Sequence, residues 1–159
     1  MVLRALFFIY LIVFTSSIWA QGLSNERIWK IGNRKKGIYQ DRGVFHSGVE
    51  GTPGVLLSVR HSMNKEIQAE RIVLDFSGEK IPRVYGHISP TGDKIYIDLF
   101  STTMNTTSSF DGKGEYLKTV EFYPISKDIL SLELGFKHKV TADVFFLEAP
   151  GRFVIDIKK

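Results

Sequence analysis

The chain has 159 residues, of which 43% are hydrophobic and 24% are charged, a composition typical of a globular protein rather than of a disordered or fibrous one. It contains no cysteine, which excludes disulfides, thiolate metal sites and a cysteine nucleophile. The net charge of +4 does not come from the C-terminal two thirds, because residues 51–159 carry 14 basic and 14 acidic side chains. A nucleic-acid-binding domain is expected to carry a basic surface of its own, so we do not expect nucleic acid as a partner.

The first 20 residues are typical of a secretory signal peptide. Arg4 precedes an uninterrupted apolar run at residues 5–14, and residues 15–20 close it with polar and small side chains ending in Ala20. The run is shorter than the roughly 20 apolar residues that span a bilayer. We therefore predict cleavage after Ala20 and a soluble exported protein that meets the membrane only through its transient signal peptide. The alternative is an uncleaved N-terminal anchor.

Residues 21–54 form a basic, glycine-rich segment. It contains seven glycines after Gln21, and its residues 22–50 carry six basic side chains against three acidic ones. Short apolar pieces occur at residues 28–29 and 44–45, without a helical period. We predict a semi-ordered arm that has room for one docked strand, or else a tether without specific contacts. A basic arm can attract anionic polymers or membrane surfaces.

From residue 55 onward the chain predicts eight short strands separated by turns rich in Gly, Pro and Ser. A polar turn is expected at residues 61–69, and a polar loop at residues 101–115 is expected to join two halves. Apolar residues alternate along most of the strands, and no 3.6-residue period occurs after residue 55. The predicted strands are 55–60, 70–76, 83–88 and 94–100 in the first half, and 116–122, 129–134, 141–147 and 152–158 in the second half.

A short pattern repeats along these strands, and its clearest copies are Arg-Ile-Val-Leu-Asp at residues 71–75 and Arg-Phe-Val-Ile-Asp at residues 152–156. Weaker copies start at residues 94 and 129, so that the second pair repeats the first at an offset of 58. This repeat indicates an internally duplicated domain over residues 55–159. Because each strand has one apolar face that needs cover, we predict an all-β sandwich of two duplicated, roughly four-stranded sheets.

Residues 71–76, the proline-bearing turn that follows them and the closing residues 150–157 resemble an AMIN domain. The resemblance covers about residues 55–159 and implies two symmetric four-stranded sheets. It also implies a periplasmic module of the kind found in cell-separation amidases and pilus secretins, where the module binds peptidoglycan or directs the protein to the envelope. In the amidases a zinc-dependent catalytic domain follows, whereas this sequence stops at Lys159. The resemblance therefore implies binding or targeting rather than hydrolysis.

Sequence signals for catalysis and for metal binding are weak. The four histidines lack the spacing that places two zinc ligands on one element, and no Gly-x-Ser-x-Gly elbow or phosphate-binding glycine motif occurs. Asp75 and Asp156 could form an acid–base pair. However, their alternation with apolar residues favours cross-strand Arg–Asp pairs on a solvated sheet face. We expect no enzymatic activity, no metal and no cofactor.

The outer sheet faces are the predicted binding surface. Arginine can hold a carboxylate through two parallel hydrogen bonds, and an exposed aromatic ring can pack on a sugar. We expect a non-catalytic module that binds peptidoglycan, or alternatively an adaptor that docks an envelope complex through exposed sheet edges; a small hydrolase is a third, weaker alternative. The candidate binding residues are Arg60, Arg71, Arg83, Tyr85, Tyr96 and Arg152.

Overall fold

The structure is a computed structural model, and it describes residues 27–33, 37–48, 50–105 and 114–159. The predicted signal peptide, residues 1–20, lies outside the described residues. Within the described ranges the chain has no helix, and therefore none that could cross a membrane. Its strands are β1 (Ile28–Lys30), β2 (Gly43–Ser47), β3 (Gly54–Asn64), β4 (Ala69–Phe76), β5 (Val84–Ile88), β6 (Lys94–Phe100), β7 (Thr102–Met104), β8 (Leu117–Pro124), β9 (Ile129–Phe136), β10 (Thr141–Leu147) and β11 (Arg152–Lys158).

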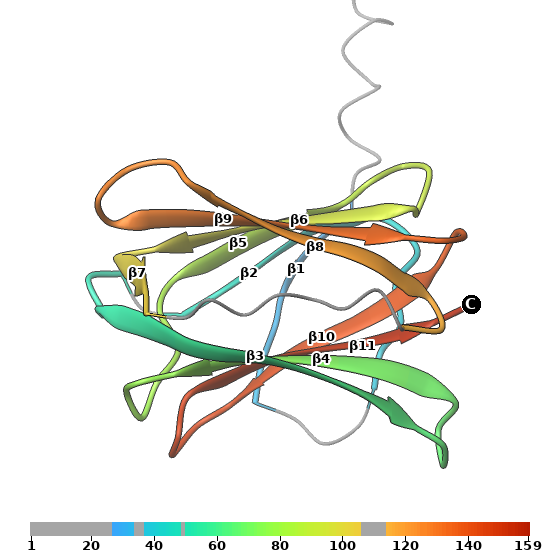
Figure 1. The fold of residues 1–159 in the computed structure, drawn as a ribbon, viewed down its shortest axis with the longest axis horizontal. Coiled ribbons are helices and arrows are strands. Elements are labelled where there is room, and N and C mark those ends of the chain that lie inside the picture. The colour runs from blue at the N-terminus through green and yellow to red at the C-terminus, as the bar shows by residue number, and fades with distance from the viewer. Residues whose placement is uncertain (1–26, 34–36, 49, 106–113) are drawn as a thin grey trace, which may run out of the picture.

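The strands form two sheets that pack face to face (Figure 1). The six-stranded sheet has the order β1-β2-β5-β6-β9-β8, and the five-stranded sheet has the order β10-β11-β4-β3-β7. All neighbouring strands are antiparallel except for β1 with β2 and β3 with β7. The predicted all-β sandwich of two sheets is confirmed.

Each half of the duplicated region contributes two strands to each sheet. The six-stranded sheet contains β5 and β6 from the first half beside β9 and β8 from the second, and the five-stranded sheet contains β10 and β11 beside β4 and β3. In the order of the repeat, β3, β4, β5 and β6 correspond to β8, β9, β10 and β11. The order β5-β6-β9-β8 in one sheet therefore corresponds strand by strand to the order β10-β11-β4-β3 in the other. A half on its own would therefore leave both of its hairpins uncovered, which explains why the two halves fold together.

The strand pairing corrects the predicted offset between β4 and its counterpart β9. Lys94 pairs with Gly135 in the six-stranded sheet, whereas Arg152 pairs with Asp75 in the five-stranded sheet. Gly135, 60 residues after Asp75, is thus its counterpart, and the predicted offset of 58 is wrong by two residues for β4 and β9. Both β3 and β8 carry a register shift at matching positions, Leu56/Ser58 and Leu117/Thr119. Because both halves contain this bulge, it leaves the offset unchanged, and the offset varies because the segments between the strands differ in length.

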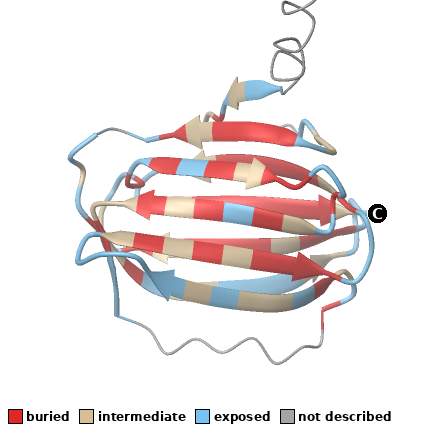
Figure 2. Ribbon diagram, turned by 90° about the horizontal axis from the view of Figure 1, so that it is seen from above, coloured by how far each residue is buried: buried red, intermediate tan, exposed pale blue. Residues whose placement is uncertain are grey.

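The core lies between the sheets, where the alternating apolar residues meet. Ile72, Leu74 and Phe76 of β4 are buried, as are Phe153, Ile155 and Ile157 of β11. Figure 2 shows burial alternating along the central strands of the larger sheet. The predicted facing of these strands is confirmed, because a period of two residues places every second side chain in the interior.

Part of the segment 21–54 is built into the sandwich. Two strands, β1 and β2, extend the six-stranded sheet, and backbone bridges join Asn33 to Phe146 and Gln40 to Ala142 at the edge of β10. Ile31 and Phe45 are buried in the main core. The described part of the segment therefore runs from one sheet to the edge of the other and back, and it contains two strands where we expected room for one.

Two turn boundaries differ from the sequence prediction. Strand β3 continues to Asn64, so the polar turn expected at residues 61–69 is shortened to residues 65–68. The predicted polar loop 101–115 contains the short strand β7, which pairs with residues 54–56 of β3. Residues 106–113 of that loop lie outside the described residues. Polar composition misled the prediction because these strand segments lie near a sheet edge, where polar side chains remain exposed.

Candidate binding site

The two clearest copies of the repeated pattern lie side by side at the centre of the five-stranded sheet. Strands β4 and β11 are antiparallel, with Val73 directly opposite Val154. This register places Arg71 opposite Asp156. It also places Arg152 opposite Asp75. Two equivalent Arg–Asp pairs are therefore possible across this strand pair, one on each side of the central valines.

The first of these pairs is formed. Arg71 donates from Nε and Nη2 to the two carboxylate oxygens of Asp156, both at 2.6 Å, and its guanidinium lies 5.7 Å from the ring centre of Phe145. The hydrogen bond to Asp156 raises the pKa of Arg71. The Asp156 side chain is only 4% exposed, which corrects our expectation that it meets solvent. Removing Arg71 would leave a buried, uncompensated carboxylate.

The second pair is not formed, because Arg60 of β3 has taken its carboxylate. Arg60 donates to Asp75 from Nε at 2.6 Å and from Nη2 at 2.8 Å, and the Ser58 hydroxyl donates to the same carboxylate at 2.6 Å. The hydrogen bond from Arg60 is the main cause that lowers the pKa of Asp75, against the opposing effect of burial. Asp75 is thus fully engaged by β3, and its position opposite Arg152 brings Arg152 no hydrogen bond.

Arg152 forms no side-chain hydrogen bond with a residue that the structure describes, although its charge contributes, after Arg60, to the lowered pKa of Asp75. Its Nε is buried and has no hydrogen-bond partner in the part of the chain that the structure describes. A buried donor that makes no hydrogen bond costs roughly 1–3 kcal/mol, and such groups are rare enough in native proteins to need a reason. An unused guanidinium beside a groove is the most distinctive polar feature of this face.

The groove has a volume of about 610 Å³ and lies over β3, β4 and β11. Three of the six predicted residues, Arg60, Arg71 and Arg152, line it together. Among the apolar residues that line it, Val73 and Val154 are buried and pack with Phe145 and Leu147 in a small cluster on the outer face. The remaining lining residues are His61, Ser62 and Leu147. The groove therefore combines an apolar surface with an arginine-rich wall.

A smaller pocket of about 310 Å³ adjoins the groove, and the two share Arg71. Tyr39, from the glycine-rich segment, lies over it with Lys158 Nζ 4.4 Å from the ring centre. Burial, together with the negative charges of Asp156 and Asp143, raises the pKa of Tyr39 to about 12. The segment 21–54 thus covers part of the sheet face that we expected to be open, which explains the burial of Asp156.

The other three predicted residues lie on the opposite side of the molecule. Arg83 precedes β5, with its guanidinium 5.5 Å from the ring centre of Phe100 and 3.4 Å from the Glu50 carboxylate. Tyr85 and Tyr96 are 45% and 41% exposed on the outer face of the six-stranded sheet. The predicted binding residues therefore lie on two different faces of the molecule. The reason is that the two hairpins of each half belong to different sheets, as β3 and β4 do compared with β5 and β6.

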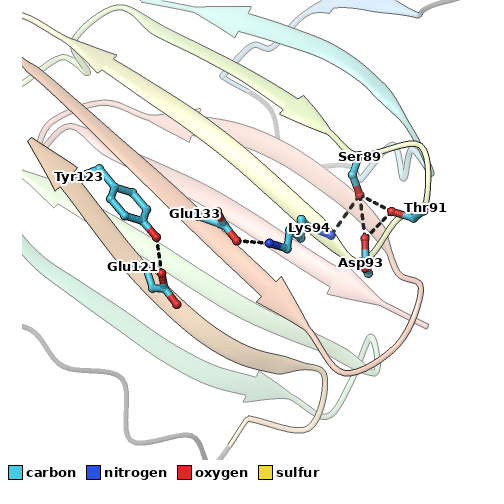
Figure 3. Close-up of polar contacts among 7 residues, drawn as sticks. All are labelled: Ser89, Thr91, Asp93, Lys94, Glu121, Tyr123 and Glu133. Carbon is cyan, nitrogen blue, oxygen red and sulfur yellow. Dashed lines mark hydrogen bonds and ion pairs between the residues drawn. The ribbon is translucent and has the colours of Figure 1, made fainter. Parts of the chain in front are cut away.

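The six-stranded sheet carries the counterpart of the arginine groove, and its polar contacts are different (Figure 3). Lys94 occupies the position of Arg152, and its Nζ donates to Glu133 at 2.6 Å. Glu133 occupies the position of Val73, since it pairs with Tyr96 as Val73 pairs with Val154. Glu121, which accepts a hydrogen bond from the Tyr123 hydroxyl, occupies the position of Arg60. Lys94 is thus bonded to a carboxylate, whereas Arg152, at the equivalent position of the other sheet, forms no such bond with a described residue.

The two carboxylates considered as an acid–base pair are both held by arginine, Asp75 by Arg60 and Asp156 by Arg71. In the described ranges no group of three or more His, Asp or Glu side chains is placed to hold a metal ion. The sequence prediction did not include Tyr39, Ser58 or Leu147, which cover, position or line the site. In the sequence, only the residue types of these three side chains could have marked them as candidates, because their contacts at the site depend on which strands pair.

No protein-family model matches the chain, and no curated protein matches it.

Proposed function

We propose that the chain is an exported, non-catalytic module that binds peptidoglycan, and that the outer face of the five-stranded sheet is its binding surface. The observation that carries the proposal is the gathering of Arg60, Arg71 and Arg152 around one groove with apolar lining. Peptidoglycan presents peptide carboxylates beside apolar side chains and sugar rings, and arginine is well suited to hold a carboxylate.

Two features of the sequence support the same proposal. The residues that resemble an AMIN domain, 71–76 and 150–157, form the two central strands beneath the groove. The first 20 residues have the layout of a secretory signal peptide, which would bring the chain to the compartment that contains the cell wall.

The experiment is co-sedimentation of the purified full chain with cell-wall sacculi. We expect wild-type protein to sediment, and the double variant Arg60→Ala/Arg152→Ala to remain in the supernatant. The matched control is Arg83→Ala, which removes one positive charge from the opposite face. Circular dichroism and thermal unfolding establish that each variant is folded. The proposal is wrong if the wild-type protein does not sediment, or if the control fails as completely as the groove variant.

A second candidate function is an adaptor that accepts a strand from a partner protein. Among the described residues, β8 ends the six-stranded sheet, and residues 57–64 of β3 have a strand neighbour on one side only. Leu57 is 46% exposed on this edge. An adaptor should ignore sacculi and co-purify with one protein, and Leu57→Lys should weaken that association, because charge on an edge opposes strand addition.

A further inference from the structure

Of the three arginines that line the groove, one is not held by a carboxylate hydrogen bond within the described residues. Three arginines line it, and two carboxylates, Asp75 and Asp156, are bonded to two of them. Arg152 forms no side-chain hydrogen bond within the described chain, and its Nε is an unused donor. Asp75, the nearest acid in register, already accepts three hydrogen bonds from Arg60 and Ser58. Arg152 is therefore the arginine with an unused donor, although after Arg60 its charge also helps to lower the pKa of Asp75.

The counterpart face shows how the same backbone position is satisfied internally. Lys94 stands at the position of Arg152 and is bonded to Glu133, which stands at the position of Val73. On the groove face Val73 stands in place of that glutamate, and Asp75, which lies opposite Arg152, is held by Arg60, so that no carboxylate of the described residues forms a hydrogen bond with Arg152. The same replacement adds an apolar surface next to the guanidinium.

We propose that the groove recognises a single carboxylate on an apolar group, with Arg152 as the residue that binds it. The carboxylate occupies the place that Glu133 fills on the other face and accepts the hydrogen bonds that Arg152 does not donate within the described chain. Because Nε is covered in this conformation, side-on binding by two parallel hydrogen bonds requires the Arg152 side chain to turn toward the groove. Val73 and Val154 then contact the apolar part of the ligand. The ligand class is the free carboxyl end of a peptide with a small apolar residue, and only the choice of a cell-wall peptide as its source rests on the proposed function.

The test is a titration of the isotope-labelled full chain followed by amide NMR shifts. N-acetylalanine is the probe, and N-acetylalaninamide is its uncharged match. We expect saturable shifts in β4 and β11 with the acid alone, and an affinity at least about tenfold weaker in Arg152→Gln, since hydrogen bonds to charged groups contribute most. The control Lys94→Gln removes the same charge at the counterpart position and should bind like wild type. Arg152→Lys should bind with intermediate affinity, because lysine keeps the charge and loses the planar pair of donors.

Other outcomes overturn the inference. Equal shifts with the amide would mean that the carboxylate is not recognised, and equal weakening in Lys94→Gln would mean that only net charge matters. If inorganic phosphate binds as tightly as N-acetylalanine, the groove recognises anions in general and is not specific for a carboxylate. Sedimentation with sacculi separates this inference from the proposed function. Carboxylate binding without sedimentation refutes the wall as the ligand, whereas sedimentation that survives Arg152→Gln refutes the role of Arg152.

Discussion

Phe45 is the residue that most directly tests whether the glycine-rich segment belongs to the fold. Its ring is fully buried, 5.6 Å from the ring centre of Trp29 and 6.2 Å from that of Phe153. It also fills the space above Gly86, where an added Cβ would lie 2.1 Å from the ring. The contact therefore joins the segment to β5 and to the last strand of the chain.

Phe45→Ala should lower the free energy of unfolding by about 3–5 kcal/mol, the usual cost of removing a buried phenylalanine ring. Domains of this size are stable by about 5–15 kcal/mol, so the urea midpoint should fall steeply or the protein should unfold. The assay is equilibrium unfolding in urea, followed by tryptophan fluorescence and circular dichroism. Ile28→Ala, in the same segment but at a side chain that is 70% exposed, should change stability by less than about 0.5 kcal/mol.

A loss of less than about 1 kcal/mol in Phe45→Ala would refute this reasoning, because it would mean that the ring is not held in the core in solution. The segment would then be a tether, as one of the two sequence interpretations holds. Equal losses in Phe45→Ala and Ile28→Ala would lead to the same conclusion.

Three further predictions concern charged and polar groups. The pKa of Tyr39 in the folded protein, about 12, lies above its ordinary value of 10.0. The stability that Tyr39 contributes is therefore complete below pH 10 and is lost as the pH rises toward 12. Over this pH range the melting temperature of Tyr39→Phe should fall less than that of the wild-type protein. The hydrogen bond from Arg60 lowers the pKa of Asp75 from 3.8. The stability that Asp75 contributes is therefore present above pH 3.8 and is lost as the pH falls through the pKa of the folded protein. In thermal melts, Asp75→Asn should be less stable than wild type at pH 7 and should lose less stability than wild type below pH 4. Glu70 is buried and accepts hydrogen bonds from the backbone amides of Tyr116 at 2.5 Å and Leu117 at 2.9 Å; Glu70→Ala should cost about 2–3 kcal/mol in urea unfolding, and Glu70→Gln, which keeps an acceptor, should cost less.

The strands and their facing could be predicted from the sequence because they depend on local alternation. In residues 71–76 every second side chain is large and apolar, and this two-residue period assigns the inner face wherever the partner strand lies. The same reasoning failed for residues 28–31 and 43–47, which are short and surrounded by glycine. Phe45 is buried because Gly86 leaves room for its ring and Phe153 packs against it, and neither contact is visible in local sequence.

The site could be predicted only in part, because its partners are set by register. The pattern at residues 71–75 identified Arg71 and Asp75 as outward-facing residues, but not the strands that supply their partners. Arg60 reaches Asp75 because β3 is shifted in register between Leu56 and Ser58. Such a bulge changes the side-chain pairing of every later residue of the strand. Tyr96 lies far from Arg60, Arg71 and Arg152 because its strand, β6, belongs to the six-stranded sheet and theirs belong to the five-stranded sheet.

The difference between the two faces suggests one substitution that would close the site. Val73→Glu would restore on the groove face the acid that Glu133 supplies to Lys94 on the other face. We expect the new carboxylate to bond to Arg152 and to abolish the N-acetylalanine shifts, although every arginine of the groove is retained. Val73→Gln, of equal size without the charge, should keep a measurable fraction of the binding. If Val73→Glu binds the acid as wild type does, then the missing internal carboxylate is not what leaves Arg152 free for a ligand.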